Sequence, residues 1–444
     1  MSGTAITAGI NNADFCGADN RAIQAAIDAA AQRGGGTVRV LPGAYVLEDS
    51  VHLRDGIRLV GAGPETILRK APERYSKLSA YLGYGHYDVS VAEPGQFAVG
   101  MGVTVRDNNA FGFYETIATL VWRDGDRFGI DQMLNHDYSG DNGGEIYTSF
   151  APVSAKSVRD VEVRDLVIEG NKQVNPHFLN GCRGAGVFLL AVKNATVAGV
   201  TVRDLNGDAI GFQQCTRVRI EDCVLQDNTG HGLHPGSGSV GGIIRGCTCA
   251  GNGHDGVFFC LRAAHCICDA CHFVGNGDHG VSIGHRDSNN AIVECRIEDN
   301  GAAGVFLRDC DEVMAPHATL IARNSIANNC VSREATSPAE AGLQSPRRRD
   351  AEILIEPAVR DLRVLDNAIA RRAGSPPIFG IRVGKKVLGA HVCGNRFDGR
   401  FIEQVEVECD AGAVSFERPR GDLPVGPESA TPDADRHLPP NVRG

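Results

Sequence analysis

The sequence predicts an all-β chain folded as a parallel β-helix, with coils of about 24 residues. Three columns of like residues, each repeating every 24 positions, carry this prediction. They are the cysteines Cys223, Cys247, Cys271 and Cys295, the asparagines Asn228, Asn252, Asn276 and Asn300, and the glycines Gly232, Gly256, Gly280 and Gly304. A fixed period of about 20 to 30 residues without helical apolar spacing is typical of a solenoid.

Alternation of apolar residues within each repeat indicates strands rather than helices. Val218 and Ile220 form one alternating pair, Leu233 and Pro235 form another, and turn residues separate the short runs. Like residues then stack ~4.8 Å apart on neighbouring coils. We expect the cysteine column to be a reduced ladder inside the solenoid. We expect the asparagine column to be a hydrogen-bonded ladder at a turn.

One amphipathic helix is predicted near the N-terminus, over residues 19–33. Asp19 supplies an N-cap, Ile23 and Ile27 have helical spacing, and three glycines follow from Gly34. Such a helix would cover the open end of the first coil, whose core and strand edge are otherwise exposed.

The remaining chain is predicted to be one β-helix domain over residues 1–415. The 24-residue rhythm is lost over 100–150, which we interpret as inserted strands and loops that wall a cleft or contact a second subunit. Residues 332–350 are expected to form a loop. Residues 416–444, rich in proline, glycine and mixed charge, are expected to form a disordered tail.

Charge and hydropathy limit the classes of molecule that the protein is expected to bind. The chain has 44 basic and 54 acidic residues, a net charge of −10, which disfavours nucleic-acid and membrane binding. No export signal and no run of 18 apolar residues occur, so the sequence as given predicts a cytoplasmic protein, secreted only if a leader was removed. No cofactor is predicted.

A column of titratable residues marks one face of the central coils. Each member comes just before a strand, and the column is Asp208, His231, Asp255 and His279. In the strands that follow, the third and fifth positions are apolar and point inward, so the fourth, sixth and eighth are expected to face solvent. Residues beside the column on this outer side, predicted to bind substrate, are His234, Gln213, Arg262, His285, Arg286 and Arg308.

The N-terminal motifs resemble the pectin-lyase-like superfamily of right-handed β-helix proteins. These motifs are Ala22–Ala30, Gly34–Val38, Pro42–Tyr45 and Leu59–Gly63. With the coils from about 157 to 400, the resemblance covers most of the chain. It implies a right-handed parallel β-helix that acts on a poly- or oligosaccharide, and it specifies the fold more strongly than the chemistry.

The central coils resemble the polygalacturonase family in part. Asp278–Gly284 is similar to that family's histidine motif, Asp255 takes the place of one of its paired aspartates, and Arg308 lies near its cationic motif. His254 and His231 stand where the family has aspartates.

Three functions remain open. Hydrolysis is slightly preferred: Asp208 and Asp255, two coils and ~9–10 Å apart, would serve as base and acid, with His231 and His279 modulating them. A lyase or epimerase would use His231 or His279 as base, with Arg262 or Arg286 holding a uronate carboxylate. A non-catalytic glycan-binding β-helix is the third. A metal at His231, Asp255 and His279 is disfavoured, because a flat row converges poorly on one ion.

Overall fold

The computed structural model describes residues 5–331 and 350–416, which divide into two compact units. The first contains Met1–Cys215 and Cys223–His234, and the second contains Thr216–Asp222 and Pro235–Gly444. The predicted loop at 332–350 lies outside the described residues except for Asp350, and so does the predicted tail except for Phe416. No helix among the described residues is long and apolar enough to cross a membrane.

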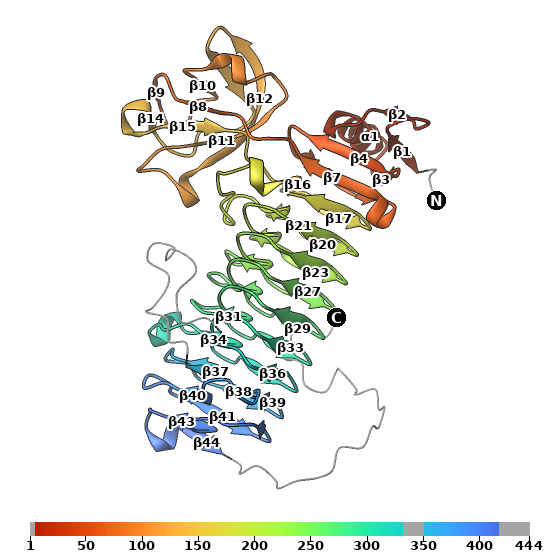
Figure 1. The fold of residues 1–444 in the computed structure, drawn as a ribbon. Helices are drawn as coiled ribbons and strands as arrows, with labels where there is room; N and C mark the ends of the chain where they lie inside the picture. The colour runs from red at the N-terminus through yellow and green to blue at the C-terminus, as the bar shows by residue number, and fades with distance from the viewer. Residues whose placement is uncertain (1–4, 332–349, 417–444) are drawn as a thin grey trace. The chain divides into compact units, whose positions relative to one another are not determined.

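Three parallel sheets run through the first unit (Figure 1). Sheet 1 contains β1 (Ile6–Gly9), β2 (Phe15–Cys16), β3 (Gly36–Val40), β6 (Ile57–Val60), β17 (Arg159–Arg164) and β20 (Lys193–Ala198). Sheet 2 contains β4 (Gly43–Leu47), β7 (Thr66–Lys70), β18 (Val167–Glu169), β21 (Thr201–Arg203) and β24 (Val224–Gln226). Sheet 3 contains β5 (Val51–His52), β16 (Val153–Lys156), β19 (Val187–Leu190), β22 (Ile210–Gln213) and β25 (Leu233–Gly236).

The second unit has strands in the same three sheets. Those of sheet 1 are β23 (Thr216–Glu221), β26 (Ile243–Arg245), β29 (Ile267–Asp269), β32 (Ala291–Val293), β35 (Leu320–Ala322), β38 (Leu362–Leu365), β41 (Ala390–Cys393) and β44 (Val414–Phe416). Those of sheet 2 are β27 (Thr248–Ala250), β30 (His272–Val274), β33 (Arg296–Glu298), β36 (Ser325–Ala327), β39 (Ala368–Ala370) and β42 (Arg396–Asp398). Those of sheet 3 are β28 (Val257–Phe258), β31 (Val281–Ile283), β34 (Val305–Leu307), β37 (Ala351–Ile355), β40 (Phe379–Val383) and β43 (Val405–Val407).

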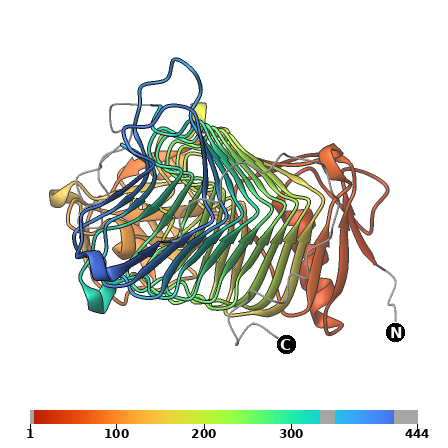
Figure 2. The same ribbon diagram turned by 90° about the horizontal axis from the view of Figure 1, so that it is seen from below.

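Parallel pairing with a 24-residue step confirms the predicted β-helix. Ile243 pairs with Ile267, which pairs with Ala291, and Val257 pairs with Val281. Figure 2 shows the coils of each unit stacked in register. Inward side chains of sheet 3, such as Val257 and Val281, are fully buried, so each coil covers the apolar core of the next.

The predicted helix is α1 (Asn20–Gln32), with Asp19 as its N-cap. The Asp19 carboxylate accepts the backbone N–H of Arg21 at 3.0 Å, satisfying a free N–H of the first turn. Ile23 and Ile27 are fully buried, and the helix packs against β1 and β3. Short 3₁₀ turns are η1 (Gly63–Glu65), η2 (Pro94–Gln96), η3 (Gly112–Tyr114), η4 (Gly140–Asn142), η5 (Lys172–Val174), η6 (Glu312–Met314) and η7 (Ala411–Ala413).

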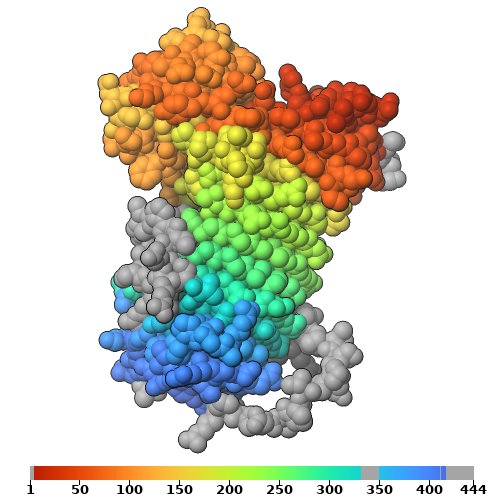
Figure 3. Space-filling view, in the orientation of Figure 1, coloured from red at the N-terminus to blue at the C-terminus, as the bar shows by residue number. Residues whose placement is uncertain are grey.

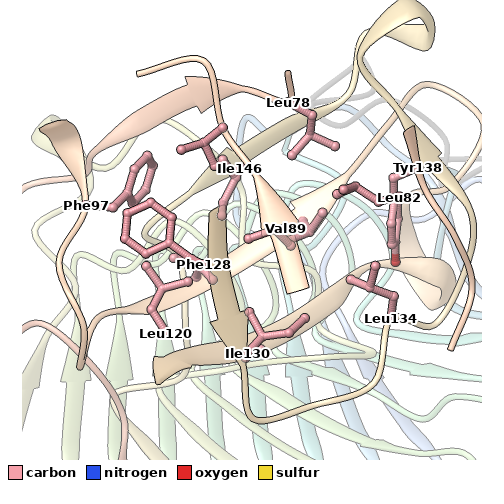
Figure 4. Packing of buried hydrophobic residues seen from close by; sticks show 14 of the residues in the cluster. Leu78, Leu82, Val89, Phe97, Leu120, Phe128, Ile130, Leu134, Tyr138 and Ile146 are labelled. Carbon is pink, nitrogen blue, oxygen red and sulfur yellow. The ribbon is translucent and has the colours of Figure 1, made fainter. Parts of the chain in front are cut away.

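The predicted insertion is an antiparallel lobe of the first unit that begins at Tyr75 rather than near residue 100. Its six-stranded sheet has the order β10 (Asp88–Ser90), β13 (Arg127–Ile130), β12 (Thr116–Asp124), β11 (Gly102–Arg106), β15 (Glu145–Tyr147), β8 (Tyr75–Lys77). A further pair joins β9 (Tyr81–Leu82) and β14 (Tyr138–Ser139). The lobe has its own buried cluster, in which Phe128, Leu120 and Ile130 pack together (Figure 4). In the space-filling view it is the orange surface beside the red N-terminal coils (Figure 3).

The asparagine ladder forms as predicted in the second unit. Asn276 donates its side-chain amide to Asn300 Oδ1 at 2.9 Å and to the Cys249 carbonyl at 3.0 Å. Its own Oδ1 accepts the backbone and side-chain N–H groups of Asn252 at 3.2 and 3.0 Å. Each amide therefore joins three coils. Asn228, in the first unit, likewise accepts the N–H of Leu205 at 3.0 Å.

The cysteine column is buried, and every cysteine of the chain is a free thiol. Hydrogen bonds with Cys247 and Cys295, followed by burial, raise the pKa of Cys271 above its ordinary value. These three thiols therefore lie side by side in the second unit as protonated, small apolar groups.

Replacing Asn276 with alanine should lower the free energy of unfolding by roughly 3 kcal/mol, because four buried hydrogen-bonding groups lose their partner. Chemical denaturation monitored by circular dichroism measures the loss. The control is Asn109→Ala, which removes an exposed amide. An unfolding midpoint of the Asn276 variant equal to that of the wild type would show that the ladder adds no stability.

Candidate functional site

Three predicted site residues meet on sheet 3 in the first unit. Asp208 precedes β22, and its Oδ1 accepts the backbone N–H of His231 at 2.7 Å. Oδ2 of Asp208 lies 2.7 Å from Nδ1 of His234, in β25. The ring centroids of His231 and His234 are 5.5 Å apart at 75°. The structure thus brings Asp208, His231 and His234 together as one buried cluster, each 1 to 2% exposed.

The ionisation of Asp208 follows from these contacts. Burial alone would raise the pKa of Asp208, but the charge of His231 and the hydrogen bond from His234 outweigh it and lower this pKa to about 2. A carboxylate can only accept hydrogen bonds, so Nδ1 of His234 carries the proton in this contact. In the neutral ring, Nε2 of His234 is then the basic nitrogen.

The cluster of Asp208, His231 and His234 is covered by a loop that the regular coils do not contain. Val153 pairs with Val187, 34 residues later, whereas Val187 pairs with Ile210, 23 residues later, so the first of these coils is longer. Its extra residues include Gly181, where a Cβ would lie 1.8 Å from Asp208 Oδ2 and 2.6 Å from His234 Nδ1. Only glycine permits such close backbone approach.

Gln213 is the fourth predicted site residue that lies in the first unit. It lies at the end of β22, is 2% exposed, and directs its Nε2 toward the Gly181 carbonyl at 3.4 Å. The unequal spacing of the coils between 153 and 210 was the signal in the sequence for this covering loop. The sequence prediction used only the regular coils and missed it.

Two predicted residues meet in the second unit. Asp255 accepts the backbone N–H of His279 at 2.8 Å, which repeats the bond between Asp208 and His231. The ring of His279 stacks on Phe306, with centroids 4.5 Å apart and planes at 25°. Asp255 and His279 are 2 and 4% exposed. The predicted pair of Asp208 and Asp255 is divided between the two units.

Arg308, predicted to bind substrate, is held by internal contacts. Its guanidinium donates to Ser282 Oγ at 2.8 Å and to the Phe259 carbonyl at 2.5 Å, and it lies 3.3 Å from Asp287 Oδ2. It also lies over the Phe258 ring, 4.3 Å from the centroid. Burial raises the pKa of Asp287 to about 7, against the opposing charge of Arg308.

The other predicted residues lie at the turns after these strands. Arg262 and Arg286 are exposed and His285 is half-buried. The Nε of Arg286 donates to the Val313 carbonyl at 3.0 Å. Burial, followed by the charge of Arg308, lowers the pKa of His285.

The expectation that the outward positions of these strands face solvent is wrong. His234, Phe258, Ser282, Phe306 and Arg308 are all less than 5% exposed. The covering loop with Gly181 encloses His234, Arg308 lies over Phe258, and Phe306 packs with Ala351 and Leu354. These outward side chains of sheet 3 are therefore buried as well as the inward ones. Among residues 5–331 and 350–416, no three His, Cys, Asp or Glu side chains form a metal-binding group.

Comparison with protein families supports the geometry. The family described as "Right handed beta helix region" matches residues 185–344. No curated protein sequence matches the chain.

Solved structures with the same fold cover nearly the whole chain. The A-modules of the Azotobacter vinelandii mannuronan C-5 epimerases AlgE4 and AlgE6 are 16 and 17% identical, with TM-scores of 0.54 and 0.55. These matches cover 90 and 91% of this chain and 95 and 96% of the modules. Polygalacturonase from Erwinia carotovora ssp. carotovora is 13% identical, with a TM-score of 0.53 over 94% of this chain and 98% of that enzyme. The chain therefore has the right-handed, pectin-lyase-like β-helix fold.

Because the pKa of Asp208 is low, the free energy of unfolding should decrease as the pH falls through the acid range. An ionised Asp208 stabilises the folded state above its unfolded pKa of about 3.9, and this contribution disappears as pH falls toward about 2. We expect Asp208→Asn to lose roughly 2–3 kcal/mol near pH 6, and the difference from wild type to shrink below pH 4. Urea unfolding at several pH values measures it, with the exposed Asp124→Asn as control. A difference independent of pH from 6 to 2.5 would contradict this ionisation.

The close contact between Gly181 and Asp208 predicts that a larger residue at position 181 destabilises the protein. Gly181→Ala should lower the free energy of unfolding by roughly 1–3 kcal/mol, because the new methyl group displaces the Asp208 carboxylate or the covering loop. Gly95→Ala is the matched control, since a Cβ there meets no heavy atom within 4 Å. Thermal melts compare the two, and equal melting temperatures would show that the loop does not press on Asp208.

Proposed function

We propose that the chain is a carbohydrate-active enzyme that cleaves a uronate-containing poly- or oligosaccharide by β-elimination, with His234 as the base. The observation that carries the proposal is the bond between Asp208 and His234, because it fixes the ring and leaves Nε2 as the basic nitrogen. A histidine oriented by a carboxylate in this way is a recurring general-base arrangement. The sequence pointed to His231 or His279 as the base, and we propose their neighbour His234 in their place.

Hydrolysis by Asp208 is less well supported. Both oxygens of Asp208 already accept hydrogen bonds, one from His231 and one from His234. A pKa of about 2 also makes this carboxylate a weak base toward water. Asp208 is therefore better suited to hold His234 than to activate a nucleophile.

The elimination is balanced without water or an oxidant. His234 Nε2 takes the proton from C-5 of the uronate, next to the carboxylate. The electron pair of the C–H bond forms the C4–C5 double bond, the C4–O bond breaks, and the leaving oxygen takes the proton that His234 removed. Mannuronan C-5 epimerases, whose A-modules share this fold, are named for a reaction at C-5 of a uronate.

A cation has to stabilise the charge that develops on the uronate carboxylate. Arg183 lies two residues after Gly181 in the covering loop of the first unit, and it is half-buried. A guanidinium can bind a carboxylate with two parallel hydrogen bonds. Because His234 is 1% exposed, substrate reaches it only when the segment around Gly181 moves aside.

Product analysis tests the proposal. We expect polygalacturonate, polymannuronate or a glucuronate-containing polymer to yield products with the absorbance of a new C=C bond. His234→Gln should lower turnover at least about 100-fold, because a general base contributes roughly that much. His391→Gln, on the second unit, should keep full activity, and far-ultraviolet circular dichroism checks that both variants are folded.

Other products would decide against elimination. New reducing ends without unsaturated absorbance would indicate hydrolysis. Exchange of the C-5 proton with deuterated water, without chain cleavage, would indicate epimerisation by the same base. Binding of a polymer without any chemical change would identify a glycan-binding β-helix.

A further inference from the structure

A large cavity in the first unit lies between the coils and the inserted lobe. It has a volume of about 650 Å³, within the usual range for small-ligand sites. One wall is the outer side of β16 and β19, with Ser154, Lys156 and Phe188. The opposite wall is β12 and residues 131–135 of the lobe.

Two cations line this cavity. Lys156 donates to the side-chain oxygen of Gln132, and Arg183 donates through Nη2 to the Phe113 carbonyl. Arg183 Nε is buried and has no hydrogen-bond partner among the described residues. Burial lowers the pKa of Lys156, and the positive charge of Arg183 adds to this effect while Asp131 opposes it. A carboxylate between the two cations would accept hydrogen bonds from both and relieve their repulsion.

Two carboxylates, Asp49 and Asp131, also line the cavity and restrict the ligand further. Asp49 Oδ2 accepts the hydroxyl of Thr119 at 2.8 Å, and Asp131 Oδ1 accepts the Thr119 backbone N–H at 2.7 Å. His52 Nε2 lies 3.6 Å from Asp49 Oδ2. These acceptors suit hydroxyl groups and would repel a dense anion such as phosphate. The ligand chemistry that matches both the cations and the carboxylates is a polyhydroxylated ring with a single carboxylate.

Most of the exposed aromatic rings among the described residues belong to the inserted lobe. Of the nine large aromatic side chains that are exposed among the described residues, eight lie between residues 75 and 122. They are Tyr75, Tyr81, Tyr84, Tyr87, Phe111, Phe113, Tyr114 and Trp122. Exposed apolar groups gathered in this way mark a binding surface.

Tyr114 and Tyr84 contact the segment that follows the cavity residue Asn135. Tyr114 packs edge-on against His136 with centroids 5.3 Å apart, and the backbone N–H of Tyr84 donates to Asp137 at 2.7 Å. The adjacent Asn135 lines the cavity. A sugar ring has an apolar face that packs on tyrosine, so an oligosaccharide can extend from the cavity onto these rings.

We propose that this cavity binds an acidic sugar of an oligo- or polysaccharide, with its carboxylate at Lys156 and Arg183 and its hydroxyls at Asp49 and Asp131. Neighbouring sugars lie on the tyrosines of the inserted lobe. The site rests on the proposed function in one respect, because it shares Arg183 with it, but binding here does not require His234 to be catalytic.

Calorimetric titration of the full chain tests the site with four probes. These are trimers of galacturonate, mannuronate and glucuronate, and a neutral xylose trimer. At least one acidic trimer should bind, more weakly as salt is added, while the neutral trimer should bind weakly or not at all. Lys156→Met should weaken acidic binding about tenfold, because a charge-assisted hydrogen bond is lost. The matched control is Lys193→Met, which removes an exposed lysine outside the cavity.

Two further variants test the tyrosines of the lobe and the independence of this site from His234. Tyr84→Ala, which truncates a 63% exposed ring, should weaken binding of an acidic hexamer more than that of a monosaccharide. His234→Gln should bind the acidic trimer like wild type, so failure of the elimination proposal would leave this result intact. Three outcomes overturn the site: no acidic trimer binds, Lys156→Met binds like wild type, or inorganic phosphate binds as tightly as the acidic trimer.

Discussion

Hydrogen bonding from coil to coil at a fixed register is the constraint on which the rest of the structure depends. Backbone N–H groups of each parallel strand pair with the coil before it or the coil after it, so a residue is placed above its counterpart about 24 positions away. The buried asparagine ladder fixes this register at one turn, since Asn276 bonds to both neighbouring coils. A slip of one residue would point the apolar column outward and break every amide bond.

The same register explains why aspartates recur before the strands of sheet 3. Asp208 accepts the N–H of His231, and Asp255 accepts the N–H of His279. Both carboxylates thus join adjacent coils before they take part in any chemistry. Oδ2 of Asp208 also accepts a hydrogen bond from the ring of His234.

The sequence was a good guide wherever every coil contributes the same kind of residue. The cysteine and asparagine columns, the alternating strands and the helix Asn20–Gln32 could all be predicted, because each depends on local spacing. The cover over Asp208 could not, because Gly181 belongs to a coil of irregular length with no counterpart in the repeat. The start of the inserted lobe could not be predicted either. Its strand β8 begins at Tyr75 and pairs with β15, some 70 residues later, and short alternating strands do not specify such distant partners.

Two buried carboxylates show how the surroundings assign different roles to the same group. Asp287 is bonded to backbone N–H groups and lies beside Arg308, yet burial dominates and raises its pKa to about 7. Asp208 is equally buried, but two histidines lower its pKa to about 2. Asp208 is therefore an anion at neutral pH that can orient a histidine, whereas burial opposes the charge of Asp287. Because Arg308 is also bonded to Ser282 and Phe259, the pair of Asp287 and Arg308 serves to fix the strands of the second unit, and the first unit holds the better candidate for proton transfer.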